Sequence, residues 1–157
     1  DWAALDGVLP SRKRMADKFP SSPGQRPSSR SEERRGDRRL IMVLDDSPIC
    51  LESLRISFEE AGYEVVTLDS PFGFAAALQG HQPDLVLVDV TMPGLQGDKL
   101  VEIAVRNGVR AKTVIVLHSD RPEAELRVLA AQCGAAGYIR KTADEAELLR
   151  SVARFLK

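Results

Sequence analysis

Hydrophobic residues follow a repeating pattern from residue 40 to the end of the chain, where short apolar runs alternate with amphipathic stretches. The runs are too uniformly apolar for strands with one face in water, so they predict strands buried on both faces. Between the runs, apolar residues recur three and four positions apart, which predicts helices. The predicted strands are Leu40–Leu44, Tyr63–Leu68, Leu85–Val88, Val114–Leu117 and Gly137–Ile139.

Residues that begin and end helices support this division. Ser47 and Ser70 each precede a proline, which predicts a capping hydroxyl followed by proline at the first helical position. Thr142 and Glu145 have the spacing of a capping box at the start of the last helix. The predicted helix ends are Gly62, Gly80, Gly108 and Gly134.

Strict alternation of strands and helices predicts an α/β fold with parallel strands, right-handed crossovers and helices on both faces of one sheet. The stretch from Leu40 to Lys157 is too short for an eight-stranded barrel, which takes about 250 residues. We therefore expect a doubly wound, flavodoxin-like (βα)₅ open sheet with strand order 2-1-3-4-5. Such sheets bind ligands beyond the carboxyl ends of their strands.

Composition separates the first 39 residues from this domain. The 157-residue chain has a net charge of −1, but residues 1–39 carry +4 and residues 40–157 carry −5. Residues 1–39 also hold four of the nine prolines and few large apolar side chains, so we expect them to be disordered. A solvated linker is favoured over an arm that binds nucleic acid or an anionic membrane. The predicted domains are residues 1–39 and 40–157.

Several classes of protein are excluded by what the chain contains. Its longest apolar run, Leu40–Leu44, is far shorter than the roughly 20 residues of a membrane-spanning helix. No basic stretch followed by an apolar run resembles a secretory signal. Cys50 and Cys133 do not form a disulfide framework, and neither has a metal-like spacing or a histidine nearby in the sequence. A cytoplasmic location is expected.

Polar residues follow the ends of the predicted strands. Asp45 and Asp46 follow the first strand, Asp89 the third, Ser119 the fourth and Lys141 the fifth. Because the first, third and fourth strands are neighbours in the expected order, the three carboxylates should lie together, with the hydroxyl and the ammonium alongside. The carboxylates should repel one another. A hard divalent cation that takes oxygen ligands would relieve the repulsion, so the residues predict a Mg²⁺ site.

Phosphoryl chemistry follows from the same residues. Asp89, as the central carboxylate, could attack a phosphoryl donor and form an acyl phosphate, while the metal and Lys141 neutralise the phosphoryl oxygens. Ser119 could then donate a hydrogen bond to one of these oxygens and draw its loop inward. Tyr138, in the adjacent strand, could swing into the space that the loop leaves.

From Leu40 to Lys157 the sequence resembles the receiver domain of two-component response regulators. The spacings agree, with 44 residues from Asp45 to Asp89, 30 from Asp89 to Ser119 and 22 from Ser119 to Lys141. The resemblance also rests on the Asp45-Asp46 pair, Leu85–Asp89 running into Met92-Pro93-Gly94 and Gly97, and Gly137–Lys141.

This resemblance implies a role for each residue. Asp89 would be the phosphoacceptor. Asp46, Asp89 and the backbone carbonyl of Thr91 would bind Mg²⁺, and Asp45 would assist through water. Ser119 would be the switch hydroxyl, Tyr138 the switch aromatic and Lys141 the phosphate-binding lysine. Thr142 departs from the family, which usually has proline after the lysine. Thr91 and Arg121 occupy positions that in receivers modulate loss of the phosphate, and we hypothesise that Arg121 screens the acyl phosphate from water.

The function implied is a signalling switch that is not an enzyme. It would accept a phosphoryl group from a phosphohistidine on a histidine kinase or a histidine phosphotransfer protein. It would bind a downstream effector through the face of the fourth helix, fifth strand and fifth helix. No DNA-binding domain is expected in this chain, and a stand-alone receiver is favoured over the C-terminal receiver of a longer protein. Candidate residues on the output face are Arg127, Ile139, Arg140 and Glu147.

Two other functions compete with this interpretation. One is a receiver-like interaction module that works without phosphorylation, against which the complete acidic set and Lys141 argue. The other is a Mg²⁺-dependent phosphohydrolase, but Leu44–Ser47 lacks the Asp-x-Asp pair of such enzymes. Dinucleotide binding is excluded because the same turn has no glycine. His118 is expected to pack or face solvent rather than act as a base, since strand alternation turns it away from the face of Ser119.

Overall fold

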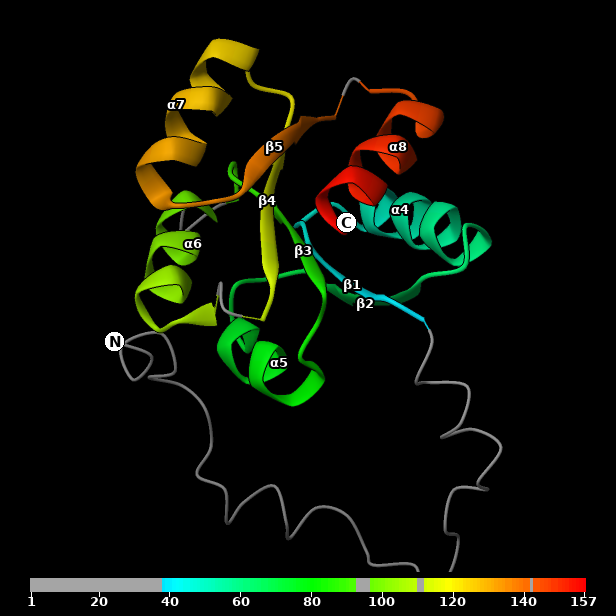
Figure 1. Cartoon of the computed structure of the whole chain (residues 1–157), viewed down its shortest axis with the longest axis horizontal. Helices are drawn as coiled ribbons and strands as arrows, with labels where there is room; N and C mark the ends of the chain where they lie inside the picture. The colour runs from blue at the N-terminus through cyan, green and yellow to red at the C-terminus, as the bar shows by residue number, and fades with distance from the viewer. Residues whose placement is uncertain (1–37, 93–96, 110–111, 142) are drawn as a thin grey trace, which may run out of the picture.

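The computed structural model describes residues 38–92, 97–109, 112–141 and 143–157 (Figure 1). Most of the predicted tail, together with Pro93, Gly94 and Thr142, lies outside this part of the chain. The strands are β1 (Leu40–Leu44), β2 (Glu64–Leu68), β3 (Leu85–Asp89), β4 (Val114–Ser119) and β5 (Gly137–Arg140). The helices are α4 (Pro48–Glu60), α5 (Phe74–His81), α6 (Gly97–Arg106), α7 (Glu123–Cys133) and α8 (Glu145–Phe155).

The strands form one parallel sheet in the order β2-β1-β3-β4-β5, which confirms the predicted doubly wound fold. Leu44 at the end of β1 is level with Val88 of β3, and Asp89 is level with His118 of β4. The register therefore brings the carboxyl ends of the three central strands to one edge of the sheet, where the predicted site residues follow.

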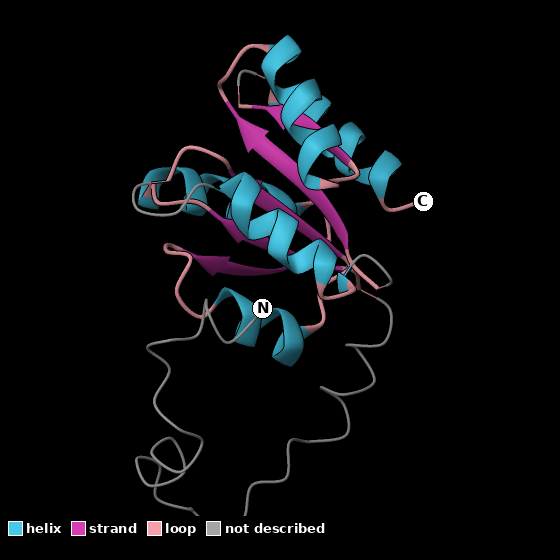
Figure 2. Cartoon of the chain, turned by 90° about the vertical axis from the view of Figure 1, so that its left-hand side faces the viewer, coloured by secondary structure: helices cyan, strands magenta, loops and turns pink. Residues whose placement is uncertain are grey.

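Side chains alternate between two separate cores on the two faces of the sheet. Ile41 and Val43 of β1 pack with α4 and α8, whereas Met42 and Leu44 pack with α5, α6 and α7. Figures 1 and 2 show the resulting three layers, with α4 and α8 on one face of the sheet and α5, α6 and α7 on the other. This alternation decides which layer each polar residue at the strand ends faces.

Helix boundaries agree only in part with the sequence signals. Ser47 caps α4 as predicted, since its hydroxyl accepts a hydrogen bond from the Cys50 backbone N–H at 3.3 Å. The predicted cap at Ser70 is wrong, because its hydroxyl accepts from the nearby Phe72 N–H and closes a turn, and α5 begins only after Gly73. Gly80 does not end α5, which continues to His81.

The start of the last helix also differs from the prediction. Asp144, not Thr142, is the N-cap of α8, and its carboxylate accepts a hydrogen bond from the Glu147 backbone N–H at 2.8 Å. A carboxylate at a helix N-terminus also interacts favourably with the helix dipole, which a threonine hydroxyl does less strongly. Gly62, Gly108 and Gly134 follow α4, α6 and α7 with positive φ angles, as predicted.

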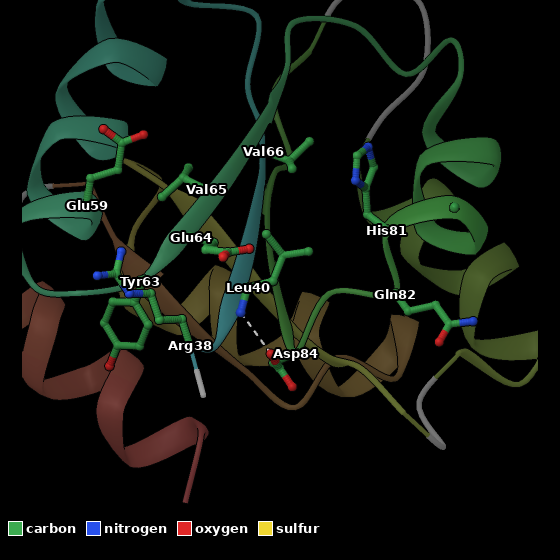
Figure 3. A pocket seen from close by; sticks show the side chains of 11 residues that line it. Arg38, Leu40, Glu59, Tyr63, Glu64, Val65, Val66, His81, Gln82 and Asp84 are labelled. Atoms are coloured by element: carbon green, nitrogen blue, oxygen red, sulfur yellow. Dashed lines mark hydrogen bonds between the residues drawn. The ribbon is translucent and has the colours of Figure 1, made fainter. Parts of the chain in front are cut away.

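The amino ends of the strands lie at the opposite edge of the sheet from the predicted site. Asp84 holds the start of β1 there, with its carboxylate accepting from the Leu40 N–H at 2.8 Å and pairing with Arg39 at 3.4 Å. An open pocket of about 900 Å³ lies beside it, lined by Leu40, Glu64 and the end of α5 (Figure 3). In the described part of the chain, no helix has the length and apolar character needed to cross a membrane.

Candidate functional site

Three carboxylates meet at the carboxyl edge of the sheet. Asp45 follows β1 and Asp89 ends β3, and both continue the alternation that faces α4 and α8. Asp45 is 1% exposed and Asp89 3% exposed, whereas Asp46 is exposed to solvent. Carboxylate oxygens of the three residues lie within 4.8 Å of one another, so the structure brings together the acidic residues that the sequence singled out.

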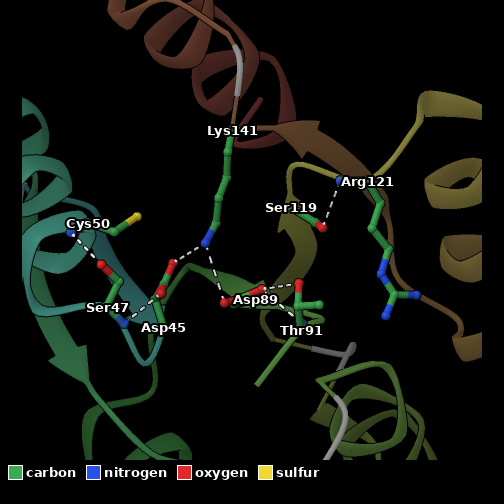
Figure 4. Close-up of polar contacts among 8 residues, drawn as sticks. All are labelled: Asp45, Ser47, Cys50, Asp89, Thr91, Ser119, Arg121 and Lys141. Carbon is green, nitrogen blue, oxygen red and sulfur yellow. Dashed lines mark hydrogen bonds and ion pairs between the residues drawn. The ribbon is translucent and has the colours of Figure 1, made fainter. Parts of the chain in front are cut away.

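Lys141 reaches into this group from the end of β5 (Figure 4). Its Nζ lies 2.7 Å from Asp45 Oδ2 and 3.4 Å from Asp89 Oδ2. Burial alone would raise the pKa of Asp45, but the Lys141 ammonium and the Ser47 backbone N–H outweigh it and hold that pKa below its usual value. Burial would lower the pKa of Lys141, but Asp45 and Asp89 outweigh it and raise that pKa. The lysine therefore stays charged.

The two oxygens of Asp89 have different surroundings. Oδ1 accepts hydrogen bonds from the backbone N–H of Thr91 at 2.9 Å and from the Thr91 hydroxyl at 3.1 Å. Oδ2 faces Lys141 Nζ at 3.4 Å, which is the long end of hydrogen-bonding distance. The carboxylate is thus oriented by Thr91 and leaves Oδ2 in weak contact with a cation.

Ser119 and Arg121 lie at the end of β4, beside Asp89. Ser119 is fully buried, and its Oγ accepts a hydrogen bond from the Arg121 backbone N–H at 3.2 Å. Its own hydroxyl proton is not used by that bond and can be donated. The Arg121 side chain points away from the carboxylates in Figure 4. The backbone N–H of Lys141 donates to the Ser119 carbonyl at 2.8 Å, which ties the ends of β4 and β5 together.

Tyr138 is half-buried on β5 and packs against the core formed with α7. Its hydroxyl donates a hydrogen bond to Glu123 Oε1 at 2.8 Å, in the first turn of α7. The ring is therefore held at the surface beside α7 rather than turned toward Ser119.

The donor set fits a hard divalent cation. Among the residues that the structure describes, Lys141 is the one cationic side chain within 4 Å of these carboxylates, so it balances one of three negative charges. Asp45 Oδ2 is buried, and the described part of the chain offers it no partner with hydrogen-bond geometry. Clustered carboxylate oxygens open to solvent on the Asp46 side are the ligands that Mg²⁺ takes while it keeps several waters.

The family follows from comparison with known sequences. Residues 41–153 match the family model of the response regulator receiver domain. The chain belongs to this family. Two relatives illustrate the range of receiver-containing proteins. The chain is 36% identical over 105 residues to the transcriptional regulatory protein KdpE of Mycobacterium tuberculosis. The aligned residues cover 65% of this chain and 44% of KdpE. The chain thus spans less than half the length of that relative.

Proteins and solved chains similar in length to this domain also match. Protein PilH of Pseudomonas aeruginosa is 26% identical over 112 residues, which cover 71% of this chain and 93% of PilH. The chemotaxis protein CheY4 of Vibrio cholerae superimposes with a TM-score of 0.69 at 25% identity, over 76% of this chain and 99% of that one. A LuxR-family two-component response regulator from Aurantimonas gives a TM-score of 0.68 at 29% identity, over 76% and 86% of the two chains.

Two residues of this receiver that the sequence interpretation set aside lie next to the acidic group. His118 is packed, as expected, but on the same face as Asp45, and it lies near Cys50 although 68 positions separate the two residues in the sequence. Burial lowers the pKa of His118 to about 4, with a smaller contribution from Lys141. Burial and the neighbouring Asp45 raise the pKa of the Cys50 thiol to about 12. The imidazole and the thiol are both neutral at pH 7.

One residue proposed for the output face of the receiver is placed elsewhere. Ile139 is 4% exposed and packs in the core with α4 and α8, so the expectation that it contacts a partner is wrong. Strand alternation turns Ile139 inward. Arg127 and Glu147 are exposed on α7 and α8, and Arg140 is half-buried on β5.

The neutral state of His118 makes the stability of the receiver depend on pH. The unfolded chain takes up a proton on His118 below about pH 6.5, whereas the folded chain does so only near pH 4, where Asp45, Asp89 and Lys141 surround the ring. The free energy of unfolding should therefore fall as pH drops from 6.5 to 4, by up to about 3 kcal/mol. Urea unfolding in buffer with chelator, at several pH values in this window, measures the slope.

A His118→Gln variant should lose most of this slope, because glutamine keeps a polar side chain without a titrating nitrogen. His81→Gln is the matched control, since His81 is exposed and its replacement should leave the slope as in wild type. A slope that is equal in the wild type and His118→Gln would contradict the assignment.

Proposed function

We propose that this receiver is a phosphorylation-controlled switch of a two-component or phosphorelay system, with Asp89 as its phosphoacceptor. The observation that carries the proposal is the position of Asp89 Oδ2, which is buried, 3.4 Å from Lys141 Nζ and grouped with Asp45 and Asp46. A phosphoryl group at this oxygen would have the lysine on one side and the acidic cluster on the other.

Asp89 supplies the nucleophile of the proposed reaction. An oxygen of Asp89 attacks the phosphorus of a phosphohistidine, the phosphorus–nitrogen bond breaks, and the imidazole leaves with the bonding electrons and takes up a proton. Asp46, Asp89 and the Thr91 carbonyl would hold Mg²⁺, with Asp45 acting through water, and the ion would supply positive charge to the phosphoryl oxygens. Lys141 supplies a second positive charge from the β5 side.

Ser119 and Tyr138 would couple phosphorylation to a change in the surface of the protein. The Ser119 hydroxyl proton can be donated to a phosphoryl oxygen, which would draw the loop after β4 toward Asp89. Tyr138 would then give up its hydrogen bond to Glu123 and turn inward. The surface that changes lies over α7, β5 and α8, where Arg127, Arg140 and Glu147 are the candidates for contact with an effector.

The partners and setting follow from this chemistry. The donor is a histidine kinase or histidine phosphotransfer protein, and the receiver acts by changing its affinity for a downstream protein rather than by turning over a substrate. We propose that it works in the cytoplasm, where phosphohistidine donors and Mg²⁺ are available.

The proposal is tested on the wild-type chain with a small-molecule phosphodonor. With Mg²⁺, the intact mass should rise by one phosphoryl group, and backbone amide shifts should move around Ser119, Tyr138 and α7. Chelation of Mg²⁺ should abolish both changes. An unchanged mass, or amide shifts confined to Asp89 itself, would favour an interaction module that works without phosphorylation.

Arg121→Ala is expected to shorten the lifetime of the phosphorylated protein by a few-fold. In the unphosphorylated structure the guanidinium points away from Asp89, but its backbone N–H is bonded to Ser119 Oγ, so movement of that hydroxyl would carry Arg121 with it. The decay of the phosphorylated mass after removal of the donor measures the effect. Arg150→Ala, an exposed position on α8, is the control, and equal decay rates in the two variants would remove Arg121 from this role.

A further inference from the structure

Cys50, His118 and Asp45 form a second group of ligand-type side chains beside the acidic cluster. The Cys50 sulfur, a ring nitrogen of His118 and a carboxylate oxygen of Asp45 all lie within 4.8 Å of one another. Asp45 belongs to both groups, whereas the thiol and the imidazole have no part in the proposed phosphoryl chemistry.

The fold brings the three residues together although they are far apart in sequence. His118 is level with Asp89 in the sheet register and faces the α4 and α8 layer. Cys50 lies in the first turn of α4, where its N–H donates to the Ser47 hydroxyl at 3.3 Å, and this turn follows Asp45 directly. Two strand ends and one helix start therefore supply the three side chains, so their positions are set by regular structure.

One oxygen of this group lacks a hydrogen-bond partner. Within the described residues, the buried Asp45 Oδ2 has no partner with hydrogen-bond geometry and is held by its ion pair with Lys141. The His118 ring beside it is 5% exposed and lines a pocket. Buried polar groups are normally hydrogen-bonded, so a carboxylate oxygen left in this state next to an imidazole and a thiol points to a missing ligand.

The group is also accessible. A pocket of about 370 Å³ opens between α4 and α8, and Cys50 and His118 line it together with Ser53, Leu148 and Lys141. An ion could enter through this pocket, and water in it could supply a further ligand. The acidic cluster is approached from the exposed Asp46.

We propose that Cys50, His118 and Asp45 bind Zn²⁺, with water from the pocket completing the coordination. Sulfur, imidazole nitrogen and carboxylate oxygen are the three ligand types that Zn²⁺ takes in proteins, and three protein ligands leave one position open. Mg²⁺ prefers oxygen ligands in octahedral geometry, so this set selects against it. Cys50 binds as the thiolate and its proton is released to solvent.

Zinc binding would oppose phosphorylation, a consequence that rests on the function proposed above. Zn²⁺ at this site takes Asp45 Oδ2, which otherwise lies 2.7 Å from Lys141 Nζ. The lysine would be pushed away by the cation, and Asp45 would no longer support Mg²⁺. Micromolar Zn²⁺ should therefore slow acyl-phosphate formation in the wild type and do so less in Cys50→Ser.

The test of the site itself uses Co²⁺ and Zn²⁺ without a phosphodonor, so it is independent of the proposed function. In excess Mg²⁺, which competes at the acidic cluster, Co²⁺ should give the wild-type protein a thiolate charge-transfer absorption that Zn²⁺ abolishes. Cys50→Ser should lose this absorption, and both Cys50→Ser and His118→Gln should bind Zn²⁺ at least about 100-fold more weakly in calorimetry, since loss of even an outer-shell partner costs 10–100-fold.

Two control variants separate this site from the alternatives. Cys133→Ser removes the other thiol, which is buried against α6 on the far side of the sheet, and should bind like wild type. Asp46→Asn weakens the acidic cluster and should leave the thiolate absorption in place. Absence of the absorption in the wild type, or its persistence in a folded Cys50→Ser or Cys50→Ala protein, would overturn the proposal.

Discussion

In Mg²⁺ and phosphodonor, the Asp89→Asn protein is expected to stay at its unmodified mass while the wild type gains one phosphoryl group. The carboxylate oxygen that faces Lys141 is the proposed nucleophile, and a neutral amide in its place has neither the charge nor the nucleophilicity to attack phosphorus. The Thr91 N–H and hydroxyl can still bond to the amide oxygen, so the side chain should keep its orientation. The loss should be complete rather than partial.

The fold of Asp89→Asn needs to be intact for this result to have meaning, and an amide spectrum that resembles the wild type establishes it. Asp98→Asn is a matched control, because Asp98 is a half-buried carboxylate in the first turn of α6 and should leave the mass gain unchanged. If Asp89→Asn still gained the phosphoryl mass, the acceptor would be another residue, and peptide mapping would identify it.

Gly97→Ala is expected to impair both stability and phosphorylation. A Cβ at residue 97 would overlap the carbonyl oxygen of Asp89 and lie 2.8 Å from its carbonyl carbon and 3.0 Å from Val88 Cγ1. Backbone cannot yield as the end of a flexible side chain can, so α6 or the end of β3 must shift. We expect a loss of about 1–3 kcal/mol in the free energy of unfolding. The initial rate of phosphorylation should fall as well, because the displaced atoms belong to Asp89.

Gly80→Ala provides the contrast. Gly80 is exposed within α5, and a Cβ there would meet no atom of the described residues within 4 Å. Alanine should therefore stabilise the protein by about 0.5–1 kcal/mol, because glycine is less favourable inside a helix. Urea unfolding and initial phosphorylation rates are measured on both variants. A Gly97→Ala protein as stable and as reactive as Gly80→Ala would show that the contact with Asp89 has no role in positioning the carboxylate.

Much of the fold could be predicted because its determinants are local. The apolar runs of β1 and β3 are buried on both faces, and Leu51, Leu54 and Phe58 have the spacing that α4 buries. Once the strand order is known, the meeting of Asp45 and Asp89 follows from chain direction alone. The acidic cluster was therefore predictable before any distance was known.

Other features depend on contacts that no sequence pattern carries. Asp144 and Glu147 repeat the capping-box spacing of Thr142 and Glu145, so spacing alone does not select Asp144 as the cap of α8. Ser70 has the residue type of a cap but bonds two residues ahead. Cys50 and His118 become neighbours only when α4 packs on the sheet, so no metal-like spacing along the chain reveals them. The alternation of side chains along the strands could by itself have placed His118 on the same face of the sheet as Asp45.

Asp84 also determines the edge of the sheet at which the chain enters the domain, and this affects how the domain can be immobilised. It anchors Leu40 and Arg39 at the amino edge of the sheet, one strand length, or about 17 Å, from the carboxyl edge. A surface tether or fluorescent reporter attached on the amino-terminal side of Arg38 is therefore joined to the domain at the edge remote from Asp89. Immobilisation through that side leaves the carboxylates facing bulk solution, so a donor protein as large as the domain itself can reach them.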